Sequence, residues 1–391
     1  MSFYDSMSGV GAMVASESAE ALPVSVVIPS YRGGKRLVEL VESLIRCNDP
    51  PGEIVVVVDD PDPETLQALK SLSSSVPIQL LAREGRRGKV SAVNEAVKLA
   101  KCDTLLFLDD DVLIEDPHFF SKVYDAMRDC DLLDIKKRVA GEGLLAKLVH
   151  IEYTAYNFAS KLMAKLARRT IAINGAAFAV KRSALESVGF FRPRLSEDFD
   201  LALRLYLKGC RFSFLDSTYV LNYAPSSWTH WLKQRKRWAV AFASWLRENF
   251  WTVLKVLVRM PHAILPGLLL SMPALLTTAV LMGLRDFAHV KLAYALLLPL
   301  SSLARFLLPA AAALSITLHV AYATTTLAIL IFIVAFAVAN SIIARLMGMK
   351  PHTCITPVYL LVYQVLWLTI LLVGLIRVFV FNNERVEDWV V

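Results

Sequence analysis

Cysteine is scarce and scattered in this sequence. The 391 residues contain five cysteines, and no two of them have C-x-x-C spacing. An odd number of widely separated cysteines argues against a disulfide framework or a zinc site and indicates a reducing compartment. The sequence therefore has to be held together by an ordinary hydrophobic core.

Three common catalytic motifs are missing. The loop GRRGK at 85–89 is not a P-loop, because Arg83 stands where the first glycine belongs and Val90 where a Ser or Thr belongs. The seven histidines form no His-Glu-x-x-His pair, and no Gly-x-Ser-x-Gly elbow is present. These absences argue against an ATPase motor, a metalloprotease and a hydrolase with a nucleophile elbow.

The first part of the chain lacks the pattern of a signal peptide. Residues 1–22 contain neither a basic start nor an apolar core of the required length. We expect them to be a flexible N-terminal leader and the catalytic part of the chain to stay in the cytoplasm.

Apolar residues and positive charge are in excess. Hydrophobic residues make up 55% of the chain, and Lys and Arg outnumber Asp and Glu by 42 to 35. The mean hydropathy of +0.49 is high for a soluble enzyme, and most of the apolar surplus follows residue 260. Nucleic acid and an anionic membrane both attract a basic protein. The position of the apolar surplus favours the membrane.

Strand and helix patterns alternate in the first half of the chain. The segments 23–33, 53–65 and 103–112 are apolar, largely β-branched runs that end in turn or acidic residues, as buried parallel strands do. Helical periodicity follows the first run at 35–46, and 78–100 contains a short strand, a basic loop and a helix. This alternation predicts an α/β domain with a mostly parallel sheet and right-handed crossovers, which we assign to residues 23–224.

Carboxylates collect at the ends of two predicted strands. Asp59 and Asp60 end one of them, and Asp109, Asp110 and Asp111 end another. Ligands of open α/β sheets bind outside the carboxyl ends of the strands. On extended backbone Asp109 and Asp111 point to one side and Asp110 to the other. A divalent cation such as Mg²⁺ or Mn²⁺, together with phosphates, explains the cluster; an acidic turn that caps the helix near Asp116 explains it equally well.

Two further stretches each allow a catalytic and a structural interpretation. The basic loop before Lys89 could meet a diphosphate at the N-terminus of the following helix, or could be a solvated turn. Ser196, Glu197 and Asp198 open a helix, where they suit an N-cap and the helix dipole. The alternative is that this acidic turn supplies a general base for an acceptor hydroxyl. The small residues at 174–177 indicate a close backbone approach to a ligand or to another strand.

A tryptophan-rich basic helix is expected at 226–251. Trp231, Gln234 and Trp238 recur at helical spacing, with Arg237 beside them and further Lys and Arg residues, including Arg235, on a basic side. Such helices favour the surface of a bilayer. We therefore expect amphipathic interface helices at 225–260.

The remainder of the chain has the composition of membrane spans. Residues 263–284 and 292–344 are apolar, with a helix break expected near 309–319, and a last span is expected at about 355–381. Length alone gives about four spans in a transmembrane domain at 261–381. The positions of Arg345 and Lys350 fit three spans and one re-entrant segment better. A polar tail is expected at 382–391.

The ordered set of motifs resembles the membrane-integrated family 2 glycosyltransferases, in particular the cellulose-synthase-like and hyaluronan-synthase-like enzymes. The resemblance covers about residues 23–251 and the placement of spans after the catalytic domain. It implies a GT-A-type nucleotide-sugar-binding domain and a Mg²⁺ or Mn²⁺ cofactor. Five segments carry it, namely VVVVDD at 55–60, GKVSAVN at 88–94, LDDDV at 108–112, SED at 196–198 and QRKRW at 234–238.

The resemblance also implies roles for individual residues. Asp109 and Asp111 take the metal role and Asp198 the role of the catalytic base. Gln234, Trp238 and Glu197 are placed near the acceptor. The donor-binding residues implied are Asp59, Asp60, Lys89, Asn94, Asp109, Asp110 and Arg237.

The implied function is inverting transfer of a hexose from a nucleotide sugar to a lipid-linked glycan on a polyprenyl or dolichyl carrier, by an integral membrane protein. The first motif continues as PDPET at 61–65, whereas relatives commonly have G-S-T-D, so we take GDP-mannose as the expected donor. The alternatives are a dolichyl-phosphate sugar synthase and a processive polysaccharide synthase. No nucleic acid or protein partner is expected.

Overall fold

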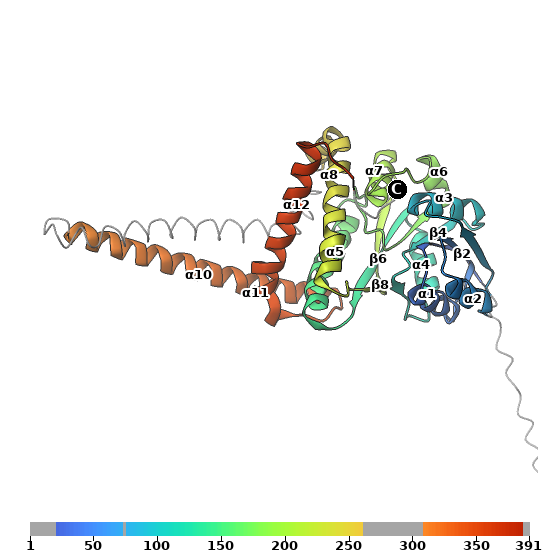
Figure 1. Ribbon diagram of the computed structural model, residues 1–391, viewed down its shortest axis with the longest axis horizontal. Helices are drawn as coiled ribbons and strands as arrows, with labels where there is room; N and C mark the ends of the chain where they lie inside the picture. The colour runs from blue at the N-terminus through green and yellow to red at the C-terminus, as the bar shows by residue number, and fades with distance from the viewer. Residues whose placement is uncertain (1–20, 73–75, 261–307, 386–391) are drawn as a thin grey trace, which may run out of the picture.

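The computed structural model describes residues 21–72, 76–260 and 308–385, with backbone only for 308–325 and 328. Residues 1–20 of the predicted leader, the predicted span at 263–284, residues 292–307 of the next apolar segment and the end of the polar tail lie outside these residues. The boundary predicted for the leader is slightly too late, because β1 begins at Leu22. Figure 1 shows an α/β domain on one side and a group of long helices on the other.

One eight-stranded sheet organises the α/β domain, in the order β3-β2-β1-β4-β7-β6-β8-β5. Its parallel half is as predicted, since β1 pairs in parallel with both β2 and β4, and β2 with β3. The second half is mixed, because β7 runs antiparallel to β4 and β6. Apolar patterning identifies a buried strand but not its direction, so the sequence did not predict this reversal. The strands are Leu22–Tyr31 (β1), Pro51–Asp59 (β2), Ile78–Arg83 (β3), Thr104–Leu108 (β4), Val112–Leu113 (β5), Leu132–Ala140 (β6), Ala177–Lys181 (β7) and Phe212–Tyr223 (β8).

Helices cover both faces of the sheet, as the hydrophobic alternation requires. Along β1, Val24, Val26 and Ile28 pack on one face and Val27 on the other. The first face is covered by Lys35–Ile45 (α1), Pro63–Ser71 (α2) and Phe119–Met127 (α4). The second is covered by Lys89–Leu99 (α3), Arg182–Ser187 (α6) and Glu197–Lys208 (α7). The two apolar layers fix the sheet and leave the carboxyl ends of β1, β2, β3 and β4 at one edge.

Long helices lie beside the sheet in the part of the chain that the structure describes. The predicted interface segment contains a single helix of 32 residues, Trp228–Arg259 (α8), which lies next to Gly143–Leu166 (α5) and Gln364–Phe379 (α12) (Figure 1). Three short turns lead into α12, namely Thr353–Ile355 (η2), Thr356–Val358 (α11) and the π-helical turn Tyr359–Tyr363 (η3). The helices α5, α8 and η3 share a core around Trp231 and Tyr363.

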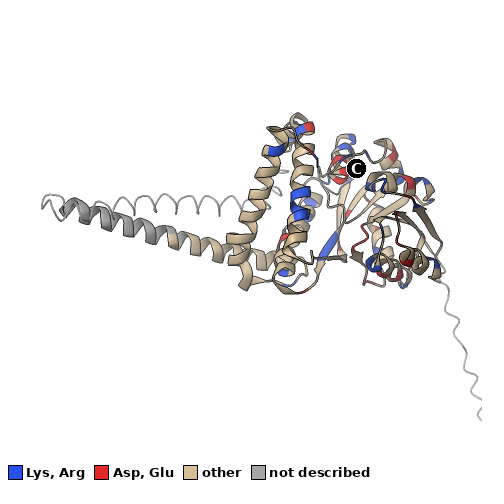
Figure 2. Ribbon diagram, in the orientation of Figure 1, with Lys and Arg blue, Asp and Glu red and all other residues tan. Residues whose placement is uncertain are grey.

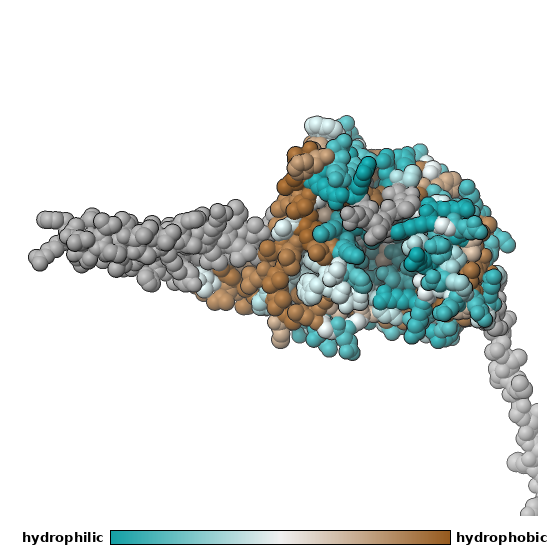
Figure 3. All heavy atoms as spheres, in the orientation of Figure 1, coloured by the Kyte–Doolittle hydropathy of each residue, from teal (hydrophilic) through white to brown (hydrophobic). Residues whose placement is uncertain are grey.

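Two segments are long and apolar enough to cross a membrane among the residues described, Ile329–Leu346 and Thr353–Phe379. The first belongs to Leu308–Leu346 (α10), which extends away from the rest of the protein (Figure 1). The break that we expected near 309–319 is absent, because those residues lie within α10. Figure 3 shows that apolar surface is concentrated over α12 and the adjoining part of α10, whereas the α/β domain is largely hydrophilic.

Candidate active site

Asp59 is fully engaged in supporting the basic loop. Its Oδ1 accepts a hydrogen bond from Arg83 Nε at 2.7 Å, and its Oδ2 accepts from the backbone N–H groups of Arg87 and Gly88 at 2.8 and 2.9 Å. The side chain is buried. The structure thus places Asp59 beneath the loop that leads to Lys89. Its neighbour Asp60 is exposed and has a positive φ of 48°, with Arg32 Nε 3.8 Å from its carboxylate.

The three successive aspartates after β4 face different partners. Asp109 pairs with Lys89 Nζ at 2.8 Å, Asp110 accepts a hydrogen bond from Ser30 Oγ, and Asp111 lies 3.5 Å from Asn222 Nδ2. Burial raises the pKa of Asp110 to about 6 despite the bond from Ser30. Burial, followed by the charges of Asp109 and Asp110, raises the pKa of Asp111 to about 7. The cluster therefore concentrates negative charge that a cation would stabilise.

These carboxylates suit a hard divalent cation of the Mg²⁺ or Mn²⁺ type. No group of three or more His, Cys, Asp or Glu side chains with metal-binding geometry occurs in the part of the chain that the structure describes. Mg²⁺ is commonly held by only one or two carboxylates, with substrate phosphates and water completing its coordination. Asp109 and Asp111 can supply those carboxylates, because both follow β4 at the same edge of the sheet.

Lys89 joins two parts of the site. It is the first residue of α3, and its Nζ lies 2.8 Å from Asp109 Oδ1 and 2.9 Å from Glu197 Oε1. Burial alone would lower the pKa of Lys89, but the two carboxylates outweigh it and raise the pKa, so the ammonium stays charged. A cation at a helix N-terminus, where backbone N–H groups point outward, is a favourable place for a phosphate group.

Asp198 lies on the other side of Glu197, held by a close backbone contact. Gly175 N donates to Asp198 Oδ2 at 3.1 Å, and a Cβ at position 175 would lie 2.9 Å from the same oxygen. Burial and the charge of Glu197 raise the pKa of Asp198 to about 7. The close approach expected at 174–177 is thus to this carboxylate, and also to β4, with which β7 pairs. Ser196 precedes the helix but does not cap it, since its Oγ donates to Ala241 O at 3.2 Å.

Asn94 supports the floor of the site. Its amide donates to Phe191 O at 2.8 Å and accepts from Phe191 N at 3.1 Å. The ring of Phe191 contacts that of Phe107, with their centroids 5.2 Å apart. A small cavity above these rings is lined by Lys89, Asp109, Gly175, Glu197 and Asp198.

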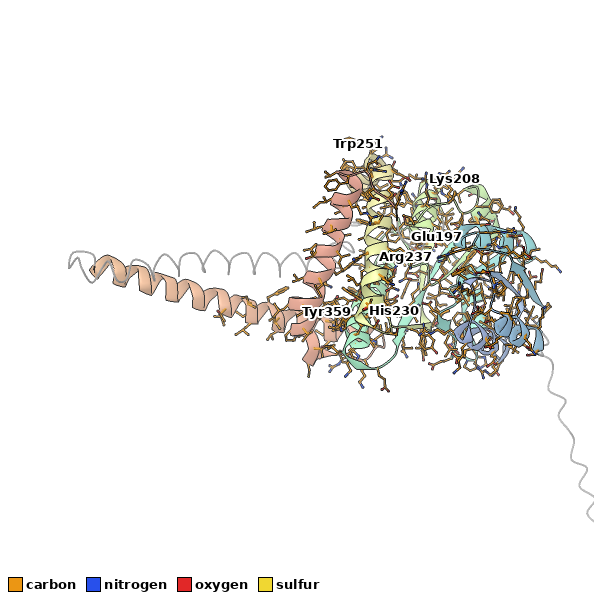
Figure 4. All side chains as sticks on the ribbon, viewed as in Figure 1. Glu197, Lys208, His230, Arg237, Trp251 and Tyr359 are labelled. Carbon is orange, nitrogen blue, oxygen red and sulfur yellow. The ribbon has the colours of Figure 1, made fainter. Side chains whose placement is uncertain are left out.

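The helix α8 brings Arg237 to the acidic cluster. Figure 4 shows Arg237 near the middle of α8, on the side where Glu197 lies. Burial lowers the pKa of Arg237, opposed by the charges of Glu197, Asp109, Asp198 and Asp111 in that order. Figure 2 marks the Lys and Arg residues of α8 in blue. Gln234 and Trp238 are half-buried on the same helix.

Arg235 differs from what the sequence predicted. We expected it on the basic side of the helix, but it is fully buried and pairs with Glu152 Oε2 at 2.5 Å. Its guanidinium also donates to Tyr363 Oη at 3.0 Å and lies 4.2 Å from the ring centroid of Trp238. Sequence reasoning missed Glu152 and Tyr363 because nothing in their local patterns points to a partner on α8.

Both the sequence and the fold are similar to those of known proteins. Residues 22–241 match the family described as "Glycosyltransferase like family 2". The chain is 24% identical over 247 residues to a poly-beta-1,6-N-acetyl-D-glucosamine synthase of Staphylococcus epidermidis, a match that covers 62% of this chain and 60% of that protein. It is 27% identical over 259 residues to the probable glycosyltransferase YdaM of Bacillus subtilis, covering 62% of this chain and 59% of that protein. The matches thus span about 60% of the length of these relatives.

A solved structure shares the fold. The mannosyltransferase PcManGT of Pyrobaculum calidifontis, in complex with GDP-Man and Mn²⁺, superposes with a TM-score of 0.53 and 20% identity, covering 72% of this chain and 83% of that one. This likeness agrees with the GT-A-type architecture expected from the sequence.

Proposed function

Since the chain belongs to glycosyltransferase-like family 2, we propose that it is a membrane-bound, inverting glycosyltransferase that moves a hexose from a nucleotide sugar to an acceptor hydroxyl. The observation that carries this proposal is the convergence of Asp198, Glu197, Lys89 and Asp109 in one cavity at the carboxyl edge of the sheet. This set combines one base with groups that can bind a diphosphate.

Asp198 is the proposed base. Its pKa near 7 suits a group that must accept a proton at neutral pH. Both carboxylate oxygens are held by the backbone, since Oδ2 accepts a hydrogen bond from Gly175 N at 3.1 Å and Oδ1 accepts one from Phe199 N at 2.8 Å. Each oxygen has a second lone pair, which is proposed to accept the proton of the acceptor hydroxyl. Direct attack of that hydroxyl on the anomeric carbon breaks the bond to the diphosphate and inverts the configuration.

Lys89, Arg237 and the aspartates after β4 form the proposed diphosphate site. Lys89 and Arg237 place positive charge beside the leaving group, where charge develops as the bond breaks. Asp109 and Asp111 would hold Mg²⁺ or Mn²⁺, which when bound neutralises the departing diphosphate. Asp59 and Asn94 act indirectly, by supporting the loop before Lys89 and the cavity floor.

The donor is proposed to be GDP-mannose. The altered sequence after Asp60 and the mannosyltransferase with a shared fold support it. UDP-N-acetylglucosamine is the second candidate, because the curated relatives include poly-beta-1,6-N-acetyl-D-glucosamine synthases. Asp60, exposed beside the end of β1, is the proposed contact for the nucleoside.

The acceptor is proposed to be a lipid-linked glycan. Gln234 and Trp238 on α8, together with Glu197, are the proposed contacts for its terminal sugar. The apolar surface of α12 beside α8 supports an acceptor that arrives from a bilayer (Figure 3). A processive polysaccharide synthase is the second candidate function, favoured by the same curated relatives. A dolichyl-phosphate sugar synthase is disfavoured, because an ionised phosphate acceptor needs no base such as Asp198.

A donor panel tests the proposal. The protein, purified in detergent, is incubated with GDP-mannose, UDP-N-acetylglucosamine and UDP-glucose, with Mn²⁺ or with a chelator, and release of nucleoside diphosphate is measured. We expect release from GDP-mannose that depends on the metal and is lost in Asp109→Ala. Release from UDP-N-acetylglucosamine alone would show that this nucleotide sugar, and not GDP-mannose, is the donor. Long products on a gel would show that the enzyme is a processive polysaccharide synthase and does not transfer a single hexose. No release from any nucleotide sugar, with lipid-linked acceptor present, would refute the function.

A further inference from the structure

The segment Thr353–Phe379 is long and apolar enough to cross a membrane, yet its two ends are both attached to the catalytic half of the protein. Before the segment, Gly348 O accepts a hydrogen bond from Arg138 Nη2 of β6 at 2.6 Å. Met349 is buried, with its sulfur 3.5 Å from Asn157 Nδ2 of α5. After the segment, Glu384 accepts a hydrogen bond from Ser244 Oγ of α8 at 2.8 Å, and Arg247 Nη1 donates to Val378 O at 3.0 Å.

Between these ends, α12 follows α8 along its length. Trp231 Nε1 donates to Tyr363 Oη at 3.0 Å near one end. One turn on, the guanidinium of Arg235 lies 5.2 Å from the ring centroid of Trp367. Further along, a Cβ at Gly374 would lie 2.7 Å from Ala239 Cβ, so the two helices approach closely. The two helices therefore run in the same direction, side by side, as Figure 1 shows.

The helix α8 also contacts the catalytic domain, at residues 241–248. Ser196 Oγ donates to Ala241 O, the ring of Phe199 packs on Trp245 at 5.5 Å, and Arg194 pairs with Glu248 at 2.7 Å. If α12 crossed a bilayer, α8 and the charged residues beside it would be carried into the hydrocarbon. Each charge at the bilayer centre costs about 3 kcal/mol or more. A transmembrane orientation of α12 is therefore incompatible with these contacts.

The face of α12 that does not contact α8 is nonetheless apolar and exposed. Leu366 is 43% exposed and Val373 is 58% exposed on one face of α12, and Val380, which caps the helix two turns further on, is 69% exposed. Exposing such a face to water is unfavourable, whereas burying it at the boundary between the headgroups and acyl chains of a bilayer is favourable. The orientation of α10, which leads away from α8 and α12, fits a crossing helix next to a surface helix (Figure 1).

We propose that α12 does not cross the membrane but lies in the plane of its surface, with its exposed apolar face in the lipid and both its ends on the side of the catalytic domain. The occupant of this face is the bilayer itself. The inference builds on the membrane association in the proposed function, but it does not depend on the donor, the acceptor or the chemistry.

Sidedness gives the first test. The starting point is a variant without the native cysteines. Three single-cysteine variants are made from it, namely Lys208→Cys in the catalytic domain, the exposed native Cys354 restored before α12, and Asn383→Cys after α12. Sealed vesicles are treated with a membrane-impermeant maleimide. We expect all three positions to react from the same side. Reaction of Asn383→Cys only from the side opposite to Lys208→Cys would overturn the proposal.

A measurement on the native sequence covers the case in which the cysteine-free variant does not fold. A peptide tag is added at the C-terminus of the otherwise unaltered chain, and its digestion by a protease is compared with that of the catalytic domain in the same vesicles. Both are expected to be digested together. A tag protected where the catalytic domain is digested would overturn the proposal.

Depth gives the second test. Leu366→Cys, Val373→Cys and Val380→Cys are labelled separately with a fluorophore and placed in liposomes whose lipids carry a quencher at a shallow or a deep position. An in-plane helix predicts the same ratio of shallow to deep quenching at all three sites. A crossing helix would separate the first and last sites by about 21 Å in depth, which would overturn the proposal. Failure of the protein to float with liposomes would instead refute membrane association itself.

Discussion

Asp198 and Gly175 are the pair of residues on which the proposed chemistry depends most. The backbone N–H of Gly175 donates to the carboxylate, and the absence of a Cβ leaves room for it. Lys89 is bonded to Glu197, the neighbour of Asp198, and to Asp109, so the base and the diphosphate site share one network of charges. A small displacement of Asp198 should therefore affect the rate of transfer more than the binding of the donor.

Gly175→Ala tests this arrangement. The added methyl group would lie 2.9 Å from Asp198 Oδ2 and must push the carboxylate aside. We expect kcat to fall by about tenfold or more, toward the 10²–10⁴-fold typical of losing a general base, with the KM for the donor little changed. Steady-state kinetics with a thermal melt of the same protein checks this. An unchanged kcat, or a loss explained by unfolding, would contradict the role of Gly175.

The pH dependence of transfer reports on Asp198 and Glu197. The base must be ionised, so a pKa of about 7 predicts that kcat/KM falls as the pH drops below about 7. Because the charge of Glu197 helps to raise this pKa, Glu197→Gln should lower it and move the acidic limb of the profile to lower pH. A limb that moves to higher pH would mean that another group controls the profile.

At this scale the sequence identified several residues of the site but not their contacts. The ordered motifs of the family resemblance selected Asp109, Lys89 and Asp198, and these three residues lie around one cavity. Asp59 and Asn94 were selected for the donor, yet both are hydrogen-bonded to the protein itself. Spacing along the chain cannot distinguish these cases, since the partner of Asn94 is 97 residues away.

Among the elements, α8 links the catalytic domain to the C-terminal helices. One side of it presents Arg237 to the acidic cluster. Another side buries Arg235 against Glu152 of α5 and Tyr363 of η3, among the rings of Trp231, Trp238 and Trp367. Replacing one member of such a pair leaves an uncompensated buried charge.

Glu152→Gln removes one partner of the buried ion pair, and Glu248→Gln removes one partner of a more exposed ion pair as its control. Arg235 and Glu152 have side chains 0% and 4% exposed, whereas Arg194 and Glu248 are 48% and 32% exposed. We expect Glu152→Gln to lower the free energy of unfolding by about 3 kcal/mol or more, and Glu248→Gln by less than about 1 kcal/mol. Denaturant titration in detergent, followed by tryptophan fluorescence, checks both. Equal losses would contradict a structural role for the buried pair.

Helical periodicity predicted α8 well but not the environment of each side. The tryptophan face is indeed buried at Trp231 and Trp245. The burial of Arg235 could not be predicted, because a basic residue on an amphipathic helix is normally solvated and its partner Glu152 belongs to a helix 83 residues upstream. The direction of β7 was missed for a similar reason, since strand pairing is not encoded in a strand's own residues.

On the scale of the whole molecule, a hydrophilic α/β domain adjoins an apolar helical side (Figure 3). The exposed residues of the described part of α10 include Leu330, Val334, Val338 and Ile342, all of them apolar. Hydropathy predicted this division and the position of the apolar segments. It could not tell a crossing helix from one that lies on the surface, because both expose apolar side chains and only contacts at the two ends distinguish them.

Membrane fractionation tests this division. We expect the full-length protein to remain with the membrane after washing with high salt and with alkaline carbonate, because its attachment is apolar rather than electrostatic. Immunoblotting of the pellet and supernatant measures this. Release by salt alone would show that the basic charges of α8 are the main attachment.

Asp198→Asn in the full-length protein tests the central claim most directly. Asparagine keeps the shape and can still accept the hydrogen bond from Gly175 N, but its amide nitrogen replaces the oxygen that accepts from Phe199 N and it cannot take a proton. With the donor that the panel identifies, we predict that donor binding stays within about twofold of the native protein while kcat falls by about 10²–10⁴-fold. Transfer that persists within about tenfold of the native rate would contradict the account.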